Sequence, residues 1–129
     1  MPDYEQTATV AAEPDELFDY LADVHHLPAY FPRMTDAEPV LGDEVVVEEE
    51  DDSGDLHRAE GWLHVDGLER RMEWGAKAGP YHGWLQIDPD DVGGSLVTIH
   101  LYQDHEGDTD ADLADALDNI RRLVSTGSL

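Results

Sequence analysis

The last apolar pattern in the chain predicts an amphipathic helix over residues 109–124. Apolar side chains recur there at three- and four-residue steps and so share one face: Leu113, Ala116, Leu117, Ile120, Leu123 and Val124. Acidic residues near the start of this segment and Arg121 and Arg122 near its end suit the helix dipole. Burial of such a stripe contributes on the order of 10 kcal/mol, so we expect the helix to cover a surface formed by the preceding chain.

The first quarter of the chain predicts one strand followed by helices. Residues 4–11 alternate apolar and polar side chains, as a strand with one buried face does. Pro14 then suits the first turn of a helix of about ten residues, whose apolar stripe is Leu17, Phe18, Leu21 and Val24. The aromatic-rich segment 25–32 contains two prolines and predicts at most one short second helix.

Residues 35–104 predict about six strands in antiparallel succession. Three hairpins are expected: 37–41 with 44–50, 56–65 with 68–76, and 81–88 with 95–104. Asp66-Gly67 is the strongest turn signal and predicts that Val65 lies opposite Leu68. An antiparallel sheet with helices on one face makes a single α+β domain over residues 1–129.

This order of elements resembles the helix-grip fold of the START-like superfamily, and specifically its polyketide cyclase/dehydrase and lipid-transport branch. Three segments carry the resemblance: 14–23, 27–32 and 113–124. It implies a curved antiparallel sheet of about six or seven strands wrapped around a long C-terminal helix, with one or two short helices after the first strand. It also implies a cavity for an apolar or amphipathic small molecule between sheet and helix. The superfamily shares no catalytic motif, so no catalytic residue is implied.

The resemblance makes the concave face of the sheet and the facing helix the candidate ligand-binding surface. Arg70 is the most informative residue there, because a permanent charge among apolar neighbours needs a partner, such as a ligand carboxylate or enolate. Alternatively, the register is off by one, or Arg70 lies near the sheet end and pairs on the surface with Glu13, Asp15 or Asp36. The full set of candidates is His26, Tyr30, Phe31, Arg70, Met72, Trp74, Tyr81, Leu85, Leu113, Leu117 and Ile120.

Three functions fit these residues, and the first is the favoured one. The protein binds a small hydrophobic or aromatic ligand, such as a lipid, a polyketide or a quinone-like molecule. Alternatively, it is a cyclase, dehydratase or hydrolase in which Arg70 stabilises an enolate and Tyr81 or His26 moves protons. As a third possibility, its interior is closed and Trp62 and Trp84 on the convex face contact another protein.

The net charge of the chain argues against some classes of binding partner. The chain has 31 Asp and Glu residues against 7 Lys and Arg, a formal net charge of -24. Such a surface repels nucleic acid and anionic lipid headgroups, and it predicts either high solubility or adaptation to high ionic strength. No apolar run is long enough to span a bilayer and the N-terminus does not resemble a signal peptide, so we expect a cytoplasmic location.

The number of histidines raises the question of a metal site. Seven histidines occur without a cysteine, and the expected register makes His82 and His100 cross-strand neighbours. No pair has the spacing of a known metal motif, and no glycine-rich phosphate loop is present. We therefore expect no metal and no cofactor, and nothing in the sequence assigns an oligomeric state.

Overall fold

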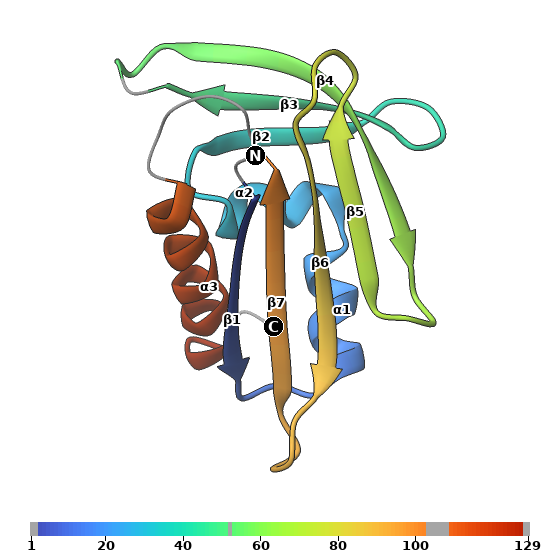
Figure 1. Cartoon of the computed structure of the whole chain (residues 1–129), viewed down its shortest axis with the longest axis vertical. Helices are drawn as coiled ribbons and strands as arrows, with labels where there is room; N and C mark the ends of the chain where they lie inside the picture. The colour runs from blue at the N-terminus through green and yellow to red at the C-terminus, as the bar shows by residue number, and fades with distance from the viewer. Residues whose placement is uncertain (1–2, 52, 103–108, 128–129) are drawn as a thin grey trace.

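The computed structural model describes residues 3–51, 53–102 and 109–127. Seven strands form one antiparallel sheet in the order β1-β7-β6-β5-β4-β3-β2, with the helices on one side of it (Figure 1). The elements are β1 Asp3–Val10, α1 Pro14–Leu21, η1 Val24–His26, α2 Leu27–Tyr30, β2 Met34–Pro39, β3 Glu44–Glu50, β4 Leu56–Asp66, β5 Arg71–Ala76, β6 His82–Pro89, β7 Ser95–Tyr102 and α3 Thr109–Ser125. This is the α+β helix-grip architecture that the sequence predicts.

The sheet bends strongly along its length. In Figure 1, β2 and β3 run across the top of the view, whereas β1 and β6 run down the view and β7 runs up between them. β1 closes against the last strand, with Asp3 opposite Tyr102 and Val10 opposite Ser95. No helix among the described residues is long and apolar enough to cross a membrane.

The predicted start of α1 is confirmed, and its end comes earlier than expected. Pro14 lies in the first turn, and the Glu13 carboxylate accepts a hydrogen bond from the Glu16 N–H at 3.0 Å. The helix stops at Leu21, and the Asp23 carboxylate then accepts from the His25 N–H to begin the short 3₁₀ turn η1. The aromatic segment after α1 therefore divides into η1 and α2.

The predicted register of the β4–β5 hairpin is wrong by four residues. Val65 lies opposite Met72 and Leu63 opposite Trp74, so residues 67–70 form a loop. The Asp66 carboxylate stabilises this longer loop, because it accepts hydrogen bonds from the backbone N–H groups of Leu68 and Glu69. An even shift preserves the alternation of faces, so Leu63, Met72 and Trp74 still share the inner face.

The predicted pairing of His82 with His100 is also wrong. His82 lies opposite Tyr102, and its ring stacks on that ring with centroids 5.1 Å apart. His100 lies opposite Trp84 and stacks on it at 5.3 Å. Pro89 pairs with Ser95, so the turn contains only residues 90–94, and the register is shifted by two residues from the one that would pair the two histidines.

The hydrophobic core joins α1, α3 and the inner face of the sheet. Tyr30 is fully buried in it, and its hydroxyl donates to the Leu21 carbonyl at 2.6 Å. The predicted stripe of α3 is confirmed, with Leu113, Ala116, Leu117 and Ile120 all buried. The strands contribute mainly Leu85, Ile87, Val97 and Ile99. These side chains fill the space beside β6 and β7, so any internal cavity lies toward the other end of the sheet.

Candidate functional site

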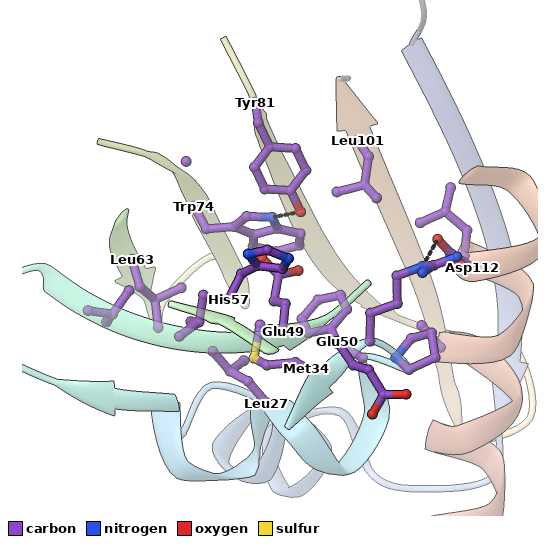
Figure 2. A pocket seen from close by; sticks show the side chains of 18 of the residues that line it. Leu27, Met34, Glu49, Glu50, His57, Leu63, Trp74, Tyr81, Leu101 and Asp112 are labelled. Carbon is purple, nitrogen blue, oxygen red and sulfur yellow. Dashed lines mark hydrogen bonds and ion pairs between the residues drawn. The ribbon is translucent and has the colours of Figure 1, made fainter. Parts of the chain in front are cut away.

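A cavity of about 480 Å³ lies where β3, β4 and β5 curve over α2 and the start of α3 (Figure 2). Its walls come from helices and strands far apart in the sequence, which the bend of the sheet brings together. The apolar lining is Leu27, Phe31, Met34, Val45, Val47, Leu63, Met72, Trp74, Leu101, Leu113 and Ala116. A pocket therefore lies where the resemblance implies a cavity between sheet and helix, and this part of the interior is not closed.

Two glycines make room for the tryptophans of the pocket wall. A Cβ on Gly83 would lie 3.0 Å from the Trp74 indole and 2.6 Å from the Leu101 side chain. A Cβ on Gly75 would lie 2.6 Å from Nε1 of Trp62. Each indole can therefore lie flat on a neighbouring strand only because these positions lack side chains.

The two tryptophans expected to form an exposed patch have different surroundings. Trp62 covers Gly75 and lines the pocket. Trp84 is on β6, two strands away, where it stacks on His100 and carries the Arg71 guanidinium 4.2 Å from its ring centroid. β5 lies between the two strands that carry these tryptophans, and 36% of the Trp62 surface is exposed.

Trp74 and Tyr81 form a polar pair inside the pocket. The indole N–H of Trp74 donates to the Tyr81 hydroxyl oxygen at 3.2 Å, as the dashed line in Figure 2 shows. Tyr81 keeps 36% of its surface exposed, but desolvation of its hydroxyl among the pocket walls is the main reason that its pKa rises to about 12, and the carboxylates of Glu49 and Asp112 add to the rise. Tyr81 therefore stays protonated at neutral pH, and its hydroxyl hydrogen is available to donate to a ligand atom.

The opening of the pocket carries a polar rim, defined here as Arg33, Glu49, Glu50, Asp51, His57 and Asp112. One ion pair and one histidine–carboxylate contact hold it together. Arg33 Nε lies 3.2 Å from Asp112 Oδ2 and so links the segment after α2 to α3. His57 Nε2 lies 2.6 Å from Asp51 Oδ2, and its hydrogen bond holds the pKa of Asp51 below its usual value.

Several of the residues that the sequence predicts for the site do lie together. The pocket is lined by Phe31, Met72, Trp74, Tyr81 and Leu113. The Phe31 ring meets the Trp74 ring edge to face, with centroids 5.4 Å apart. These side chains bring aromatic surface from the end of α2 and from β5 to the same wall.

The other predicted site residues lie elsewhere. Tyr30, Leu85, Leu117 and Ile120 are buried in the core and do not line the pocket. His26 stacks on the Tyr20 ring and bonds the Tyr20 carbonyl through Nδ1 at 2.8 Å. Packing of α1 against η1 thus turns the imidazole away from the cavity.

Arg70 lies outside the pocket, contrary to its assignment as a ligand-binding residue. It ends the β4–β5 loop with a left-handed φ of 52°, and its Nη1 contacts the Asp15 carboxylate of α1 at 3.3 Å. Its Nε donates to the Ile87 carbonyl at 3.2 Å. The alternative that pairs Arg70 with Asp15 at the sheet end is the one the structure shows, because the longer loop removes Arg70 from the strand.

None of the residues of the polar rim was in the sequence prediction, although one signal pointed to the rim. Strand side chains alternate between faces, so Val45, Val47 and Glu49 share a face. Residues 48–50 are all acidic, a pattern typical of the exposed end of a strand, so the sequence alone did not indicate that the Glu49 carboxylate belongs to a site. No set of three or more metal-ligating side chains that could hold an ion occurs within residues 3–51, 53–102 and 109–127.

Comparison with known families places this pocket in context. The sequence model of the family described as polyketide cyclase / dehydrase and lipid transport matches residues 1–124. The chain belongs to this family. The pocket between α3 and the bent sheet is therefore a feature of a polyketide cyclase/dehydrase and lipid-transport domain. None of the curated proteins matches the chain in sequence.

Solved structures show the same fold at low sequence identity. A Deinococcus radiodurans protein superposes with a TM-score of 0.79 at 18% identity, covering 98% of this chain and 99% of that one. A START superfamily protein from Mycobacterium smegmatis gives 0.71 at 12% identity, covering 95% and 93%. The di-domain ARO/CYC protein StfQ of the steffimycin biosynthetic pathway gives 0.78 at 21% identity, covering 93% of this chain but 44% of StfQ. At these identities the likeness concerns the fold.

Proposed function

We propose that this family member binds a small hydrophobic or aromatic molecule in the pocket between α3 and the sheet. The observation that carries the proposal is the cavity of about 480 Å³ with apolar and aromatic walls. Pockets of roughly 300–1,000 Å³ with such walls and a few polar groups are typical ligand sites. Lipid, polyketide and quinone-like molecules are the candidate classes.

The arrangement of the walls supports this proposal. A flat ring system placed in the cavity would contact the rings of Phe31 and Trp74, and the Tyr81 hydroxyl is available as a hydrogen-bond donor. Family membership and the START and ARO/CYC proteins among the structural neighbours support the same class of function.

A filled-pocket variant tests the proposal. Val47 lines the cavity, whereas Val46, the preceding residue on the same strand, points to the other face and does not line it. We expect 2-naphthol to quench tryptophan fluorescence of the native protein saturably. Val47→Phe should weaken this binding at least tenfold, and the matched control Val46→Phe should leave it within twofold. Absence of saturable binding, or equal loss in both variants, would contradict the proposal.

A second candidate function is enzymatic, of the cyclase or dehydratase type. The Asp51–His57 pair favours it, because a carboxylate that bonds Nε2 leaves Nδ1 as a candidate base at the pocket opening. In this reaction His57 removes a proton from the carbon beside a ligand carbonyl, and Tyr81 donates a hydrogen bond to the resulting enolate oxygen. The predicted roles of Arg70 and His26 are dropped, since neither lines the cavity.

Exchange of carbon-bound hydrogen tests this candidate. With 2-tetralone in deuterated buffer, proton NMR should show loss of the α-hydrogen signal faster with the protein than in buffer alone. His57→Gln should abolish the acceleration, and Tyr81→Phe should reduce it. His64→Gln is the control, since His64 is an exposed histidine of the same strand that does not line the pocket. If exchange is no faster with the protein than in buffer alone, the enzymatic candidate is rejected and the proposed binding function stands.

A further inference from the structure

The polar rim is strongly unbalanced in charge. Carboxylates on Glu49, Glu50, Asp51 and Asp112 line the opening, whereas Arg33 is the one permanent cation among the described lining residues. Arg33 is itself paired with Asp112 at 3.2 Å. A ligand that enters the pocket therefore passes a ring of net negative charge.

The negative potential extends from the rim into the cavity. Glu49 and Asp112 lie on different elements, β3 and α3, and both act on the Tyr81 hydroxyl in the direction that disfavours a phenolate. That hydroxyl marks the place where the polar end of a bound ligand would find its hydrogen bond. An anionic group placed there would meet the same repulsion as a phenolate.

The aromatic side chains of the pocket walls also favour a cationic ligand. Phe31, Trp74 and Tyr81 present ring faces or edges to the cavity, and Trp74 and Tyr81 are joined by a hydrogen bond. The faces of Trp and Tyr rings attract ammonium groups by roughly 0.5–2 kcal/mol, depending on desolvation. Carboxylates at the rim and ring faces inside thus favour the same sign of ligand charge.

We propose that this pocket selects ligands whose polar end is cationic, a protonated amine on an aromatic or alkyl body, and rejects the corresponding carboxylates. The inference rests on the proposed binding function and names the class of ligand. It also replaces the expectation from the sequence that Arg70 anchors a ligand carboxylate, since Arg70 is paired with Asp15 at the loop end of the hairpin. Discrimination between the two charges follows from repulsion as much as from attraction.

The experiment must separate this local preference from the attraction of any amine to a chain of net charge -24. Three probes share one body: 2-(2-naphthyl)ethylamine, 2-(2-naphthyl)ethanol and 2-naphthylacetate. Their dissociation constants are measured by tryptophan fluorescence and calorimetry at pH 7 and low salt. We expect the amine to bind at least about tenfold more tightly than the carboxylate, with the alcohol between them, and the ratio to shrink toward molar NaCl.

Two double variants with the same change in net charge complete the test. Glu49→Gln/Glu50→Gln removes two of the four rim carboxylates, whereas Asp19→Asn/Glu38→Gln neutralises exposed carboxylates on α1 and on the outer face of β2, opposite Val46. The rim variant should reduce the amine-to-carboxylate preference at least about threefold, and the control should leave it unchanged. Circular dichroism confirms folding, and Glu50→Gln alone serves if the double rim variant does not fold.

The outcomes distinguish the two proposals. If the carboxylate binds as tightly as the amine, the inference on charge is overturned and the binding function stands. If the control variant lowers the preference as much as the rim variant, the preference comes from the overall charge and the inference is again overturned. If none of the three probes binds saturably, the proposed binding function itself fails.

Discussion

Trp74 donates its indole N–H to the hydroxyl oxygen of Tyr81 at 3.2 Å, and this bond joins β5 to the start of β6 inside the pocket. Because the oxygen already accepts from Trp74, the hydroxyl hydrogen points to whatever acceptor a ligand offers. The pair is thus the natural reference point for a ligand carbonyl in an otherwise apolar cavity.

Tyr81→Phe is expected to weaken binding of a carbonyl-bearing ligand selectively. Loss of one hydrogen bond worth about 0.5–1.5 kcal/mol should raise the dissociation constant of 2-acetylnaphthalene about two- to tenfold. The hydrocarbon 2-ethylnaphthalene has no acceptor and should bind as it does to the native protein. Fluorescence titration of both probes checks this, and an equal loss for the two would show that the variant alters the shape of the pocket instead.

Stability should depend on the ionisation of Tyr81 at high pH. Its pKa in the folded protein is about 12, above the ordinary value of 10.0, so the folded state holds the proton between these values while the unfolded state releases it. The free energy of unfolding therefore falls as pH rises from about 10 to about 12. Urea titrations of the native protein and Tyr81→Phe should show a shallower fall for the variant. Parallel curves would mean that Tyr81 titrates normally.

Arg70→Gly should leave ligand affinity unchanged. Glycine relieves the cost of a positive φ, about 1 kcal/mol, and this offsets the lost contacts with Asp15 and the Ile87 carbonyl. We expect the free energy of unfolding to change by less than about 1 kcal/mol, measured by urea denaturation. A tenfold loss of naphthol affinity in a folded variant would place Arg70 in the binding site.

Gly83→Ala is expected to destabilise the sheet and disturb the pocket. The added Cβ would lie 2.6 Å from the His100 carbonyl oxygen and 3.0 Å from the Trp74 indole, so strand and ring must shift. Overpacking of this kind costs about 1–3 kcal/mol. Gly67→Ala is the control, since nothing lies within 4 Å of its Cβ position. Melting temperatures and fluorescence of both variants check the prediction, which would be wrong if the two behaved alike.

Salt should raise the melting temperature of the native protein. A net charge of -24 on one domain produces self-repulsion that destabilises the compact state. NaCl screens this repulsion, because the Debye length falls from about 30 Å at 0.01 M to about 3 Å at 1 M. We expect a rise of several degrees between these concentrations, measured by circular dichroism. A constant melting temperature would argue against adaptation to high ionic strength.

The sequence by itself determined the elements and the faces they present. The stripe of α3 from Leu113 to Ile120 and the alternation that puts Leu63, Met72 and Trp74 on the inner face were both predicted and are confirmed. These features follow from the 3.6- and 2-residue periods of the backbone, which are local properties. The fold class followed from the order of elements, because few architectures bury such an order.

Only the tertiary structure decided which inner-face residues line the pocket and which fill the core. Met72 lines the cavity and Leu85, its partner on β6, does not, although both are fully buried and both fit the pattern. The bend of the whole sheet sets that division. Arg70 does not lie on the inner face of the sheet, because the Asp66 carboxylate accepts hydrogen bonds from two backbone N–H groups and so stabilises a longer loop that includes Arg70. Glu49 and Asp112 both lie in the polar rim although more than sixty residues separate them in the sequence, and no local sequence pattern predicts such a long-range proximity.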